Sequence, residues 1–260
     1  MTEIKISNPF NAPVFHEETV TSTMDISRKL QAQGKPHGTV ITADFQENGR
    51  GRIRGRSWEM QRGKSLSFTI LLRYQSVEKI PVALTLRAGL AAALAIENKT
   101  QKGFAQCSVK IKWPNDIMIN SKKLAGILCE ADGGNVYLGI GINIFQKEFP
   151  SHLKEKAASI ANSVNIIPEN SVYEDNYRYI LLEAILLQLY NELDTPLGED
   201  WKTRLEKMFY KKDENVVFIN GAADSGKEVK GILKGINNDG ALLIENDGKV
   251  LSFITGELRL

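Results

Sequence analysis

The residues most able to do chemistry lie together at positions 49–58, in the segment GRGRIRGRSW. Arginine occupies every second position from Arg50 to Arg56, and a glycine precedes Arg50, Arg52 and Arg56. Arginine carries a fixed positive charge and a fork of donors, while glycine lets the backbone approach a ligand closely. Together these properties suit a phosphate ester or another polyanion. A solvated basic loop and a nucleic-acid backbone site are the alternatives that this segment alone leaves open.

A second candidate segment is KWPND, at positions 112–116. Pro114 favours an extended conformation at Trp113, so Asn115 and Asp116 present an amide and a carboxylate just after a strand. Asp116 can orient a cation or bind Mg²⁺, which usually keeps several waters and takes one or two carboxylates plus phosphate oxygens. A Pro-Asn-Asp turn between two strands explains the same residues without any ligand.

Two further segments place polar side chains next to regular elements. Lys123, in KKLAGIL, precedes a strand and can offer a point positive charge to a developing phosphate charge. A solvated lysine at a strand edge is the alternative. Ser22 and Thr23 precede a helical pattern, where they can cap the helix or bind a ligand at its N-terminus.

The segment GIGIN, at positions 139–143, is expected to form the floor of a site. Side chains alternate along a strand, so Gly139, Gly141 and Asn143 share one face. Two glycines on one face leave a flat surface for a planar or apolar group, although a tight contact with a helix explains them equally. The segment lacks the GxGxxG pattern and opens no helix, so a Rossmann site is not supported.

Regular elements in the rest of the chain must position these groups. The pattern predicts helices over 22–33, 81–98, 172–193 and 198–209. It predicts strands over 38–46, 65–73, 109–113 and 135–145, and a pair of strands within 116–132 around a turn at 120–122. The helix from Pro81 is almost wholly apolar and should be buried on most sides. After Lys211, short strands separated by Asn, Asp and Gly turns predict a small β-barrel appended to an α/β body.

Composition narrows the class of protein. The chain has 260 residues, 42% hydrophobic and 25% charged, with a net charge of +2, so the arginine cluster is local and bulk nucleic-acid binding is not favoured. No apolar run reaches the ~20 residues of a membrane span, and the N-terminus lacks a secretion signal. Cys107 and Cys129 form no CxxC pattern and are expected to be free thiols in a reducing cytoplasm.

The order of these segments is more specific than any one of them. A Ser-Thr pair, a strand that ends at Gln46, GRGR with a following Trp58, then KWPND, KLAGIL, GIGIN and a small β domain resemble the biotin protein ligases from about residue 15 onward. The resemblance implies an α+β fold. It places a mixed-sheet catalytic domain of the biotin/lipoate ligase, class II synthetase-like type at 1–211, and an SH3-like β-barrel at 212–260.

The resemblance also implies a biotin pocket. The S-T-N segment of the family corresponds to Ser22-Thr23-Met24, with methionine replacing asparagine, and the glutamine that binds the ureido ring corresponds to Gln46. The biotin-binding residues implied are Ser22, Thr23, Met24, Gln46, Gly49, Arg50, Gly51, Arg52, Lys123, Gly126, Gly139 and Gly141. The stretch from Gly49 to Arg52 is expected to close over biotin and the adenylate phosphate.

A nucleotide site and catalytic groups follow from the same resemblance. The ATP- or adenylate-binding residues implied are Arg52, Trp58, Lys112, Asn115, Asp116, Lys123 and Asn143, with Asp116 as the candidate Mg²⁺ ligand. The candidate catalytic residues are Lys123, Arg50 and Arg52. Two residues, Ile53 and Arg54, separate GRGR from the next glycine where the family usually has one. Arg259 is shifted relative to a family arginine that approaches ATP, so no role is assigned to it.

The activity implied is ATP-dependent ligation of biotin to one lysine of a biotin carboxyl carrier protein through biotinyl-5′-AMP, with Mg²⁺. We expect a cytoplasmic, monofunctional enzyme without an N-terminal DNA-binding domain, with no nucleic-acid or membrane partner; the resemblance also allows a homodimer. Three alternatives stay open. They are a lipoate or octanoate ligase of the same fold, a nucleic-acid-binding module that uses the arginine loop, and a non-catalytic biotin-binding protein.

Overall fold

An eight-stranded mixed sheet forms the body of the protein. The computed structural model describes residues 1–53, 55–100, 108–164, 171–195, 198, 200–221 and 226–259. The strands are β1 (Thr2–Glu3), β2 (Val14–Val20), β3 (Thr39–Gln46), β4 (Ser65–Arg73), β5 (Val109–Lys112), β6 (Asp116–Ile119), β7 (Lys122–Asp132) and β8 (Asn135–Asn143). Their order is β1-β2-β3-β4-β8-β7-β6-β5, and of these pairs β2–β3 is parallel while the rest are antiparallel.

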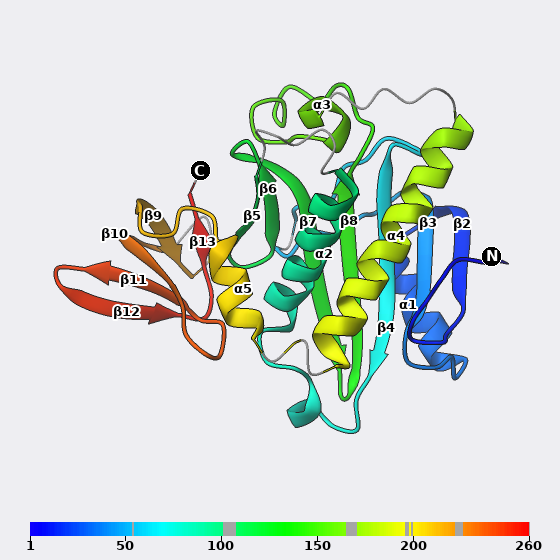
Figure 1. Cartoon of the computed structure of the whole chain (residues 1–260), viewed down its shortest axis with the longest axis horizontal. Helices are drawn as coiled ribbons and strands as arrows, with labels where there is room; N and C mark the ends of the chain where they lie inside the picture. Colours follow the sequence, from blue (N-terminus) through cyan, green and yellow to red (C-terminus); the bar gives the residue numbers. More distant parts are fainter. Residues whose placement is uncertain are drawn as a thin grey trace.

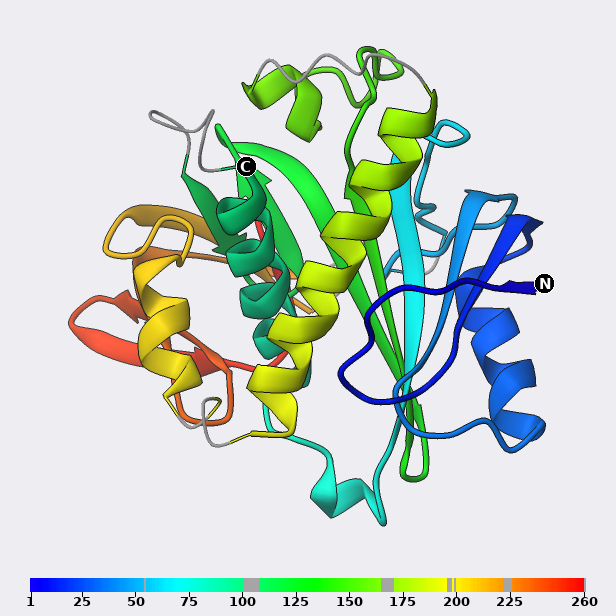
Figure 2. The same cartoon turned by 45° about the vertical axis from the view of Figure 1, so that its right-hand side comes forward.

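Helices cover both faces of this sheet (Figures 1 and 2). Helix α1 (Thr23–Ala32) connects β2 to β3 and packs against β3, β4 and β8. Helices α2 (Leu84–Thr100) and α4 (Ser171–Leu193) pack against each other on the opposite face, where α2 contacts β5, β6 and β7. The face under α1 is left partly open because one ten-residue helix cannot cover eight strands, and the candidate site lies there.

The apolar helix begins later than predicted. It starts at Leu84 instead of Pro81, because Ala83 adopts φ 54° and its carbonyl accepts the first helical hydrogen bonds from Leu86 and Arg87. The segment Val77–Lys99 is long and apolar enough to cross a membrane by length and composition, contrary to the expectation that no such run exists. Its buried part lies in the main core, which accounts for its apolar composition.

A second, smaller sheet follows the short helix α5 (Trp201–Lys207). It contains β9 (Asn215–Asn220), β10 (Lys227–Ile236), β11 (Leu242–Asn246), β12 (Lys249–Phe253) and β13 (Glu257–Leu258). All described pairings are antiparallel in the order β12-β11-β10-β9-β13, so this sheet has the strands expected of an SH3-like domain but is not hydrogen-bonded into a closed barrel. Two short elements, η1 (Val77–Lys79) and α3 (Ile160–Val164), complete the described fold.

The small sheet docks against the KWPND segment. The indole of Trp113 donates a hydrogen bond from Nε1 to the carbonyl of Gly240 at 3.0 Å, and its ring packs edge-on against Phe218. Trp113 is 3% exposed, so the contact belongs to the core. The body of the protein and its C-terminal sheet therefore meet beside the residues predicted to bind nucleotide.

Candidate active site

Glycines of β7 and β8 form the floor of a first cavity. The register pairs Gly126 with Gly141 and Leu128 with Gly139, so the predicted shared face of Gly139 and Gly141 is confirmed and Gly126 extends it. A Cβ atom added to Gly141 would lie 2.6 Å from Cε2 of Trp58, and one added to Gly139 would lie 3.0 Å from Sδ of Met24. The glycines are therefore needed for close approach by these two side chains, which line the cavity.

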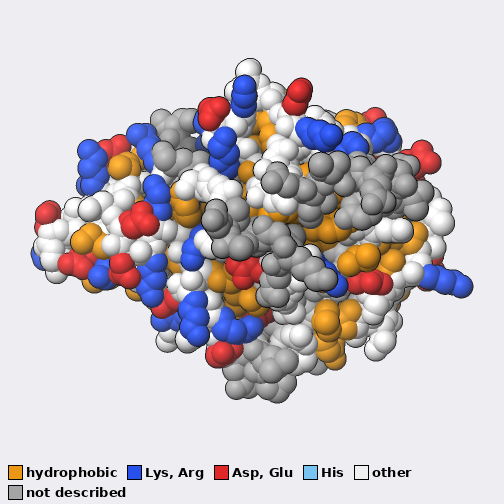
Figure 3. Space-filling view, turned by 45° about the horizontal axis from the view of Figure 1, so that its top comes forward, with side chains coloured by type: hydrophobic (Ala, Val, Ile, Leu, Met, Phe, Trp, Pro, Cys, Tyr) orange, Lys and Arg blue, Asp and Glu red, His pale blue; other side chains and the backbone are white. Residues whose placement is uncertain are grey.

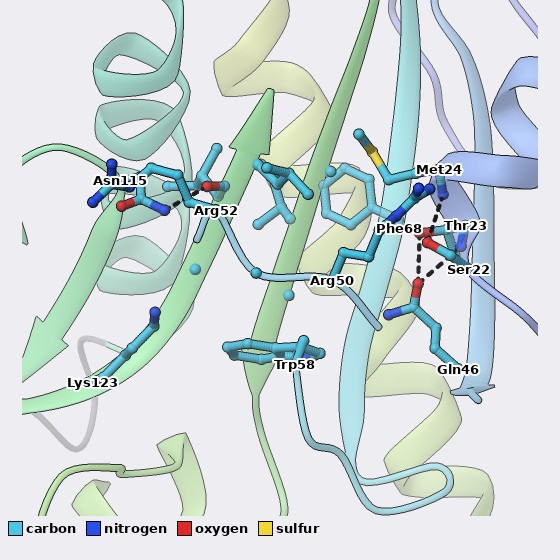
Figure 4. Close-up of a pocket in the computed structure, with 17 residues that line it drawn as sticks. Ser22, Thr23, Met24, Gln46, Arg50, Arg52, Trp58, Phe68, Asn115 and Lys123 are labelled. Atoms are coloured by element: carbon cyan, nitrogen blue, oxygen red, sulfur yellow. Dashed lines mark hydrogen bonds between the residues drawn. The ribbon is translucent and has the colours of Figure 1, made fainter. Parts of the chain in front are cut away.

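The N-terminus of α1 forms one end of this cavity, as Figure 4 shows. Ser22 caps the helix by accepting a hydrogen bond from the backbone N–H of Met24, and Thr23 donates from both N and Oγ1 to Oε1 of Gln46, at 2.9 and 3.0 Å. Thr69 donates in turn to Thr23 Oγ1. This network fixes the carboxamide of Gln46. Within the part of the chain that the structure describes, its Nε2 group makes only a long contact with Met60 Sδ, so it can donate to a ligand.

The Gly/Arg segment is a hairpin-like loop that covers the cavity. Trp58 N donates to the carbonyl of Gly49, Gly51 N donates to that of Arg56, and Arg50 pairs with Ser57 as an isolated antiparallel bridge. Gly49 is not among the residues that line the cavity. A Cβ atom there would lie 2.7 Å from the carbonyl oxygen of Trp58, so its role is to let the two arms of the loop meet. Arg54 lies outside the described residues.

Three arginines of the loop reach different parts of the protein. Arg50 Nη2 lies 2.5 Å from Oδ1 of Asp25 in the first turn of α1. Arg52 Nη2 donates to the carbonyl of Gly256 at 3.0 Å, and Arg56 Nη1 lies 2.9 Å from Glu257 Oε1. The loop therefore bridges α1 on one side and the C-terminal sheet on the other.

A second cavity adjoins the first on the side of the C-terminal sheet. Its polar lining includes the predicted nucleotide residues Arg52, Trp58, Lys112, Asn115, Asp116, Lys123 and Asn143, together with Glu257. Lys123 Nζ lies 2.6 Å from Asp116 Oδ1. Asn115 uses its amide to bind the carbonyl of Ile127 at 2.8 Å, and Asn143 donates to that of Ala158 at 3.1 Å. The structure therefore brings the predicted nucleotide-binding residues together.

The two cavities share one boundary. Gly51, Arg52, Trp58, Asn115 and Lys123 line both. A ligand that fills the first cavity from the α1 end would place its far end beside Lys123, where it would meet a ligand in the second cavity. Such a junction, with an arginine and a lysine at hand, suits a reaction between two anions, because the fixed cations offset their repulsion.

The surroundings shift the pKa of two charged groups in the second cavity. Lys112 is 4% exposed, and this burial lowers the pKa of its amine, against the opposing charges of Asp116 and Glu257. Burial alone would raise the pKa of Glu257, but the hydrogen bond and charge of Arg56, aided by Lys112 and Arg52, hold it below its usual range. The second cavity is therefore lined by both charge signs, with Glu257 ionised at neutral pH.

The carboxylates of this cavity fit Mg²⁺ only as an ion that arrives with phosphate. Among the residues described, no group of three or more His, Cys, Asp or Glu could hold a metal by itself. Asp116 and Glu257 both line the cavity, and Mg²⁺ bound to nucleotide phosphates requires only one or two protein carboxylates. Asp116 thus stays the predicted ligand, and Lys123 balances its charge when no ion is present.

Two acidic residues that pair with the loop arginines carried no predicted role. Asp25 follows the predicted Ser-Thr-Met segment directly, and Glu257 lies in the closing segment GELRL. Both carry the charge opposite to that of the loop arginines, and this complementary charge is the one sequence signal that points to them. Arg259, to which no role was assigned, lies 3.2 Å from Glu228 and is not among the residues that line either cavity.

Comparison with known proteins places the chain in a family. A model of the "Biotin/lipoate A/B protein ligase family" matches residues 17–145. A biotin–[acetyl-CoA-carboxylase] ligase from Paracoccus denitrificans is 30% identical over 226 residues, which cover 82% of this chain and 86% of that one. The chain belongs to the biotin/lipoate A/B protein ligase family.

Solved structures of the family share the whole architecture. A biotin protein ligase from Aquifex aeolicus in complex with biotin and ATP matches with a TM-score of 0.75 and 26% identity, over 95% of this chain and 97% of that one. A biotin protein ligase from Leishmania major in complex with biotinyl-5-AMP matches with a TM-score of 0.61 and 25% identity, over 93% and 98%. The predicted α+β fold is therefore confirmed. The chain spans about half the length (46%) of the first curated relatives that it matches.

Proposed function

We propose that this protein is a biotin–[biotin carboxyl carrier protein] ligase, which uses ATP to attach biotin to a lysine of a carrier domain. The observation that carries the proposal is the pair of adjoining cavities that share Arg52 and Lys123. Relatives named as biotin–[acetyl-CoA-carboxylase] ligases, and a ligase of the same architecture in complex with biotin and ATP, support it.

In the first step, the carboxylate of biotin attacks the α-phosphorus of ATP. Biotin occupies the first cavity with its ring toward Gln46 and its carboxylate toward Lys123, and ATP occupies the second cavity. A bond forms between a carboxylate oxygen and phosphorus while the bond to pyrophosphate breaks, which yields biotinyl-5′-AMP. Lys123 and Arg52 offset the repulsion between the reacting anions and stabilise charge on the phosphoryl oxygens.

Other groups of the second cavity prepare this step. Mg²⁺ bound to the phosphates would neutralise the charge of the leaving pyrophosphate, with Asp116 as its candidate protein ligand. Lys112 adds a buried positive charge beside the nucleotide. Because Arg50 lines the first cavity and is paired with Asp25, its part is to close the biotin side of the site and not to contact the phosphates.

In the second step, the ε-amine of a carrier lysine attacks the acyl carbon of the mixed anhydride, and AMP leaves. The anhydride must be shielded from water until the amine arrives. The Gly/Arg loop lies over the junction and is fixed to elements on both sides, so it can supply that shield. None of these steps requires a covalent bond to the enzyme.

The partner is proposed to be the biotin carboxyl carrier protein, or carrier domain, of acetyl-CoA carboxylase or a related biotin-dependent carboxylase. A cytoplasmic location, a homodimer and the absence of nucleic-acid and membrane partners stay predictions. On the face seen in Figure 3, acidic side chains lie among the basic ones, in keeping with the net charge of +2.

The test is a transfer assay with the full chain, ATP, Mg²⁺ and an isolated carrier domain, offered biotin, lipoate or octanoate in separate reactions. We expect the mass of the carrier domain to rise by one biotinyl group, and only with biotin. Modification by lipoate or octanoate instead would make the protein a lipoate-type ligase of the same family. Binding of biotin without any transfer or AMP release would make it a non-catalytic biotin-binding protein.

A further inference from the structure

Asp25 contacts the Gly/Arg loop from the opposite rim of the first cavity. It lies in the first turn of α1, directly after the lining residues Ser22, Thr23 and Met24, but is not itself among the residues that line either cavity. Its Oδ1 atom accepts a hydrogen bond from Nη2 of Arg50 at 2.5 Å. The carboxylate therefore acts on the loop and not on a ligand.

The pair spans the end of the cavity where α1 begins. Figure 4 shows the side chain of Arg50 extending toward Thr23 and Met24, away from Lys123 on the other side of Trp58. Gln46 lies below the same end of the cavity. An ion pair between Arg50 and Asp25 therefore joins the loop to α1 across the mouth, above the residues proposed to hold the biotin ring.

The other anchors of the loop lie on the opposite side. Arg52 binds the carbonyl of Gly256, directly before β13, and Arg56 binds Glu257, the first residue of β13. The base of the loop is closed by the hydrogen bond from Trp58 N to Gly49 O. With these contacts in place, release of the Arg50–Asp25 pair would open the loop toward α1, whereas the side toward the C-terminal sheet would stay held.

We infer that Asp25 is a positioning residue that holds Arg50 across the mouth of the first cavity, so that the loop retains biotin and biotinyl-5′-AMP. The inference rests on the proposed function for the identity of the ligand. The side chains of Arg50 and Asp25 are 41% and 40% exposed, so the pair adds little to the stability of the fold. The pair instead opposes opening of the Gly/Arg loop. An exposed ion pair of this kind should slow release of biotinyl-5′-AMP about threefold to fivefold.

A different role for Asp25 must be separated from this one. A carboxylate in the first turn of a helix interacts favourably with the helix dipole, so Asp25 could matter only to α1. A double-mutant cycle distinguishes the two. If Asp25 acts through Arg50, the variant Asp25→Asn has no further effect once Arg50→Gln is present; if it acts on the helix alone, the two effects multiply.

The experiment measures release of biotinyl-5′-AMP. Labelled intermediate is formed on the enzyme from labelled biotin and ATP, and its loss is followed after excess unlabelled biotin and ATP are added. We expect Asp25→Asn to release it about threefold to fivefold faster, Asp25→Glu to stay close to wild type, and the double variant to match Arg50→Gln. The control is Glu130→Gln, which removes the α1 ion pair Arg28–Glu130 of similar exposure that does not involve the loop.

A second measurement needs no catalysis. Trypsin cleaves after the loop arginines, and its rate on the ligand-free protein reports how often the loop opens. Faster cleavage within residues 50–56 in Asp25→Asn, but not in Glu130→Gln, would support the inference even if no adenylate forms. Failure to form the adenylate would refute the proposed function alone. Unchanged release or unchanged cleavage in Asp25→Asn, or effects that multiply in the cycle, would overturn the inference.

Discussion

Gly141→Ala is the change whose effect on the site can be worked out most directly. A Cβ atom at position 141 would lie 2.6, 2.8 and 2.9 Å from Cε2, Nε1 and Cζ2 of Trp58, whereas ordinary contacts begin near 3.4 Å. The indole must therefore move by about 0.8 Å or more. Strand β8 cannot yield instead, because β4 and β7 hydrogen-bond to it on both sides.

The size of the effect follows from the cost of overpacking. Extra atoms in a well-packed position typically cost about 1–3 kcal/mol. Trp58 lines both cavities, and its indole must return to the present, now crowded, position to pack against a ligand there. Biotin binding should therefore weaken about 5- to 150-fold. Gly139→Ala should have a smaller effect, because the atom in its way is the sulfur of a flexible Met24 side chain at 3.0 Å.

Titration calorimetry with biotin, together with thermal unfolding, tests this prediction. The control is Gly89→Ala on the other face of the sheet, where a Cβ atom would lie 3.4 Å from Ile127 Cδ1, an ordinary contact. Alanine in that helix should leave biotin binding unchanged and add up to about 1 kcal/mol of stability. Biotin affinity within twofold of wild type in a folded Gly141→Ala protein would refute the account of the cavity floor.

Three further predictions concern the charged groups. Arg52→Ala should release biotinyl-5′-AMP at least about tenfold faster, because it removes a charge-assisted contact and the anchor at Gly256. Release at the wild-type rate would mean that Arg52 does not hold the Gly/Arg loop closed. Burial lowers the pKa of Lys112, so this amine loses its charge at a lower pH than an exposed lysine does. Biotin-dependent use of ATP should decline at that lower alkaline pH, and Lys112→Arg should move the decline to higher pH. An unshifted pH profile in Lys112→Arg counts against a role for the charge. The pKa of Glu257 is lowered in the folded protein, so the ionised carboxylate stabilises the fold at neutral pH, and this stabilisation is lost as the pH falls below the ordinary pKa of a glutamate. The melting temperature of Glu257→Gln should therefore depend less on acid pH than that of the wild type. An identical pH profile of the two proteins would contradict this.

Much of the fold follows from local signals in the sequence. The cap at Ser22 and the φ of 76° at Gly34 define α1 as predicted, and Asn120 and Ser121 form the predicted turn with positive φ at both positions. Strand β2 was missed because its middle carries His16 and two glutamates, which break the apolar pattern of a strand. Its pairing with β3 through the α1 crossover is tertiary information that no local window contains.

Helix α4 shows a similar limit. Helical spacing in the sequence predicts an apolar face through Tyr177, Ile180, Leu181, Ala184 and Leu187. Leu181 is buried as that period predicts, but Ile180 and Leu187 are 45% and 50% exposed, and Leu182 and Ile185 are buried in their place. A helix with apolar residues almost all round does not reveal which face packs. The packing of α4 against α2 and β4 settles which face is buried.

The candidate site was predictable as a set of residues but not as a geometry. Alternation placed Gly139 and Gly141 on one face, and segment order grouped the loop with Lys123. The sequence did not show that Arg50 and Arg52 diverge, one toward Asp25 and the other toward Gly256, because their partners lie 25 and 204 residues away. The partition of roles between the two arginines therefore depends on the tertiary structure.

The central claim is that Lys123, at the junction of the two cavities, promotes the reaction between biotin and ATP. Biotin-dependent exchange of labelled pyrophosphate into ATP measures that step without a carrier protein. We expect exchange by the wild-type protein only when biotin is present, and a loss of about a hundredfold to a thousandfold in a folded Lys123→Ala variant, since a fixed charge at a reacting group contributes at this scale. Biotin-dependent exchange at the wild-type rate in Lys123→Ala would contradict the account.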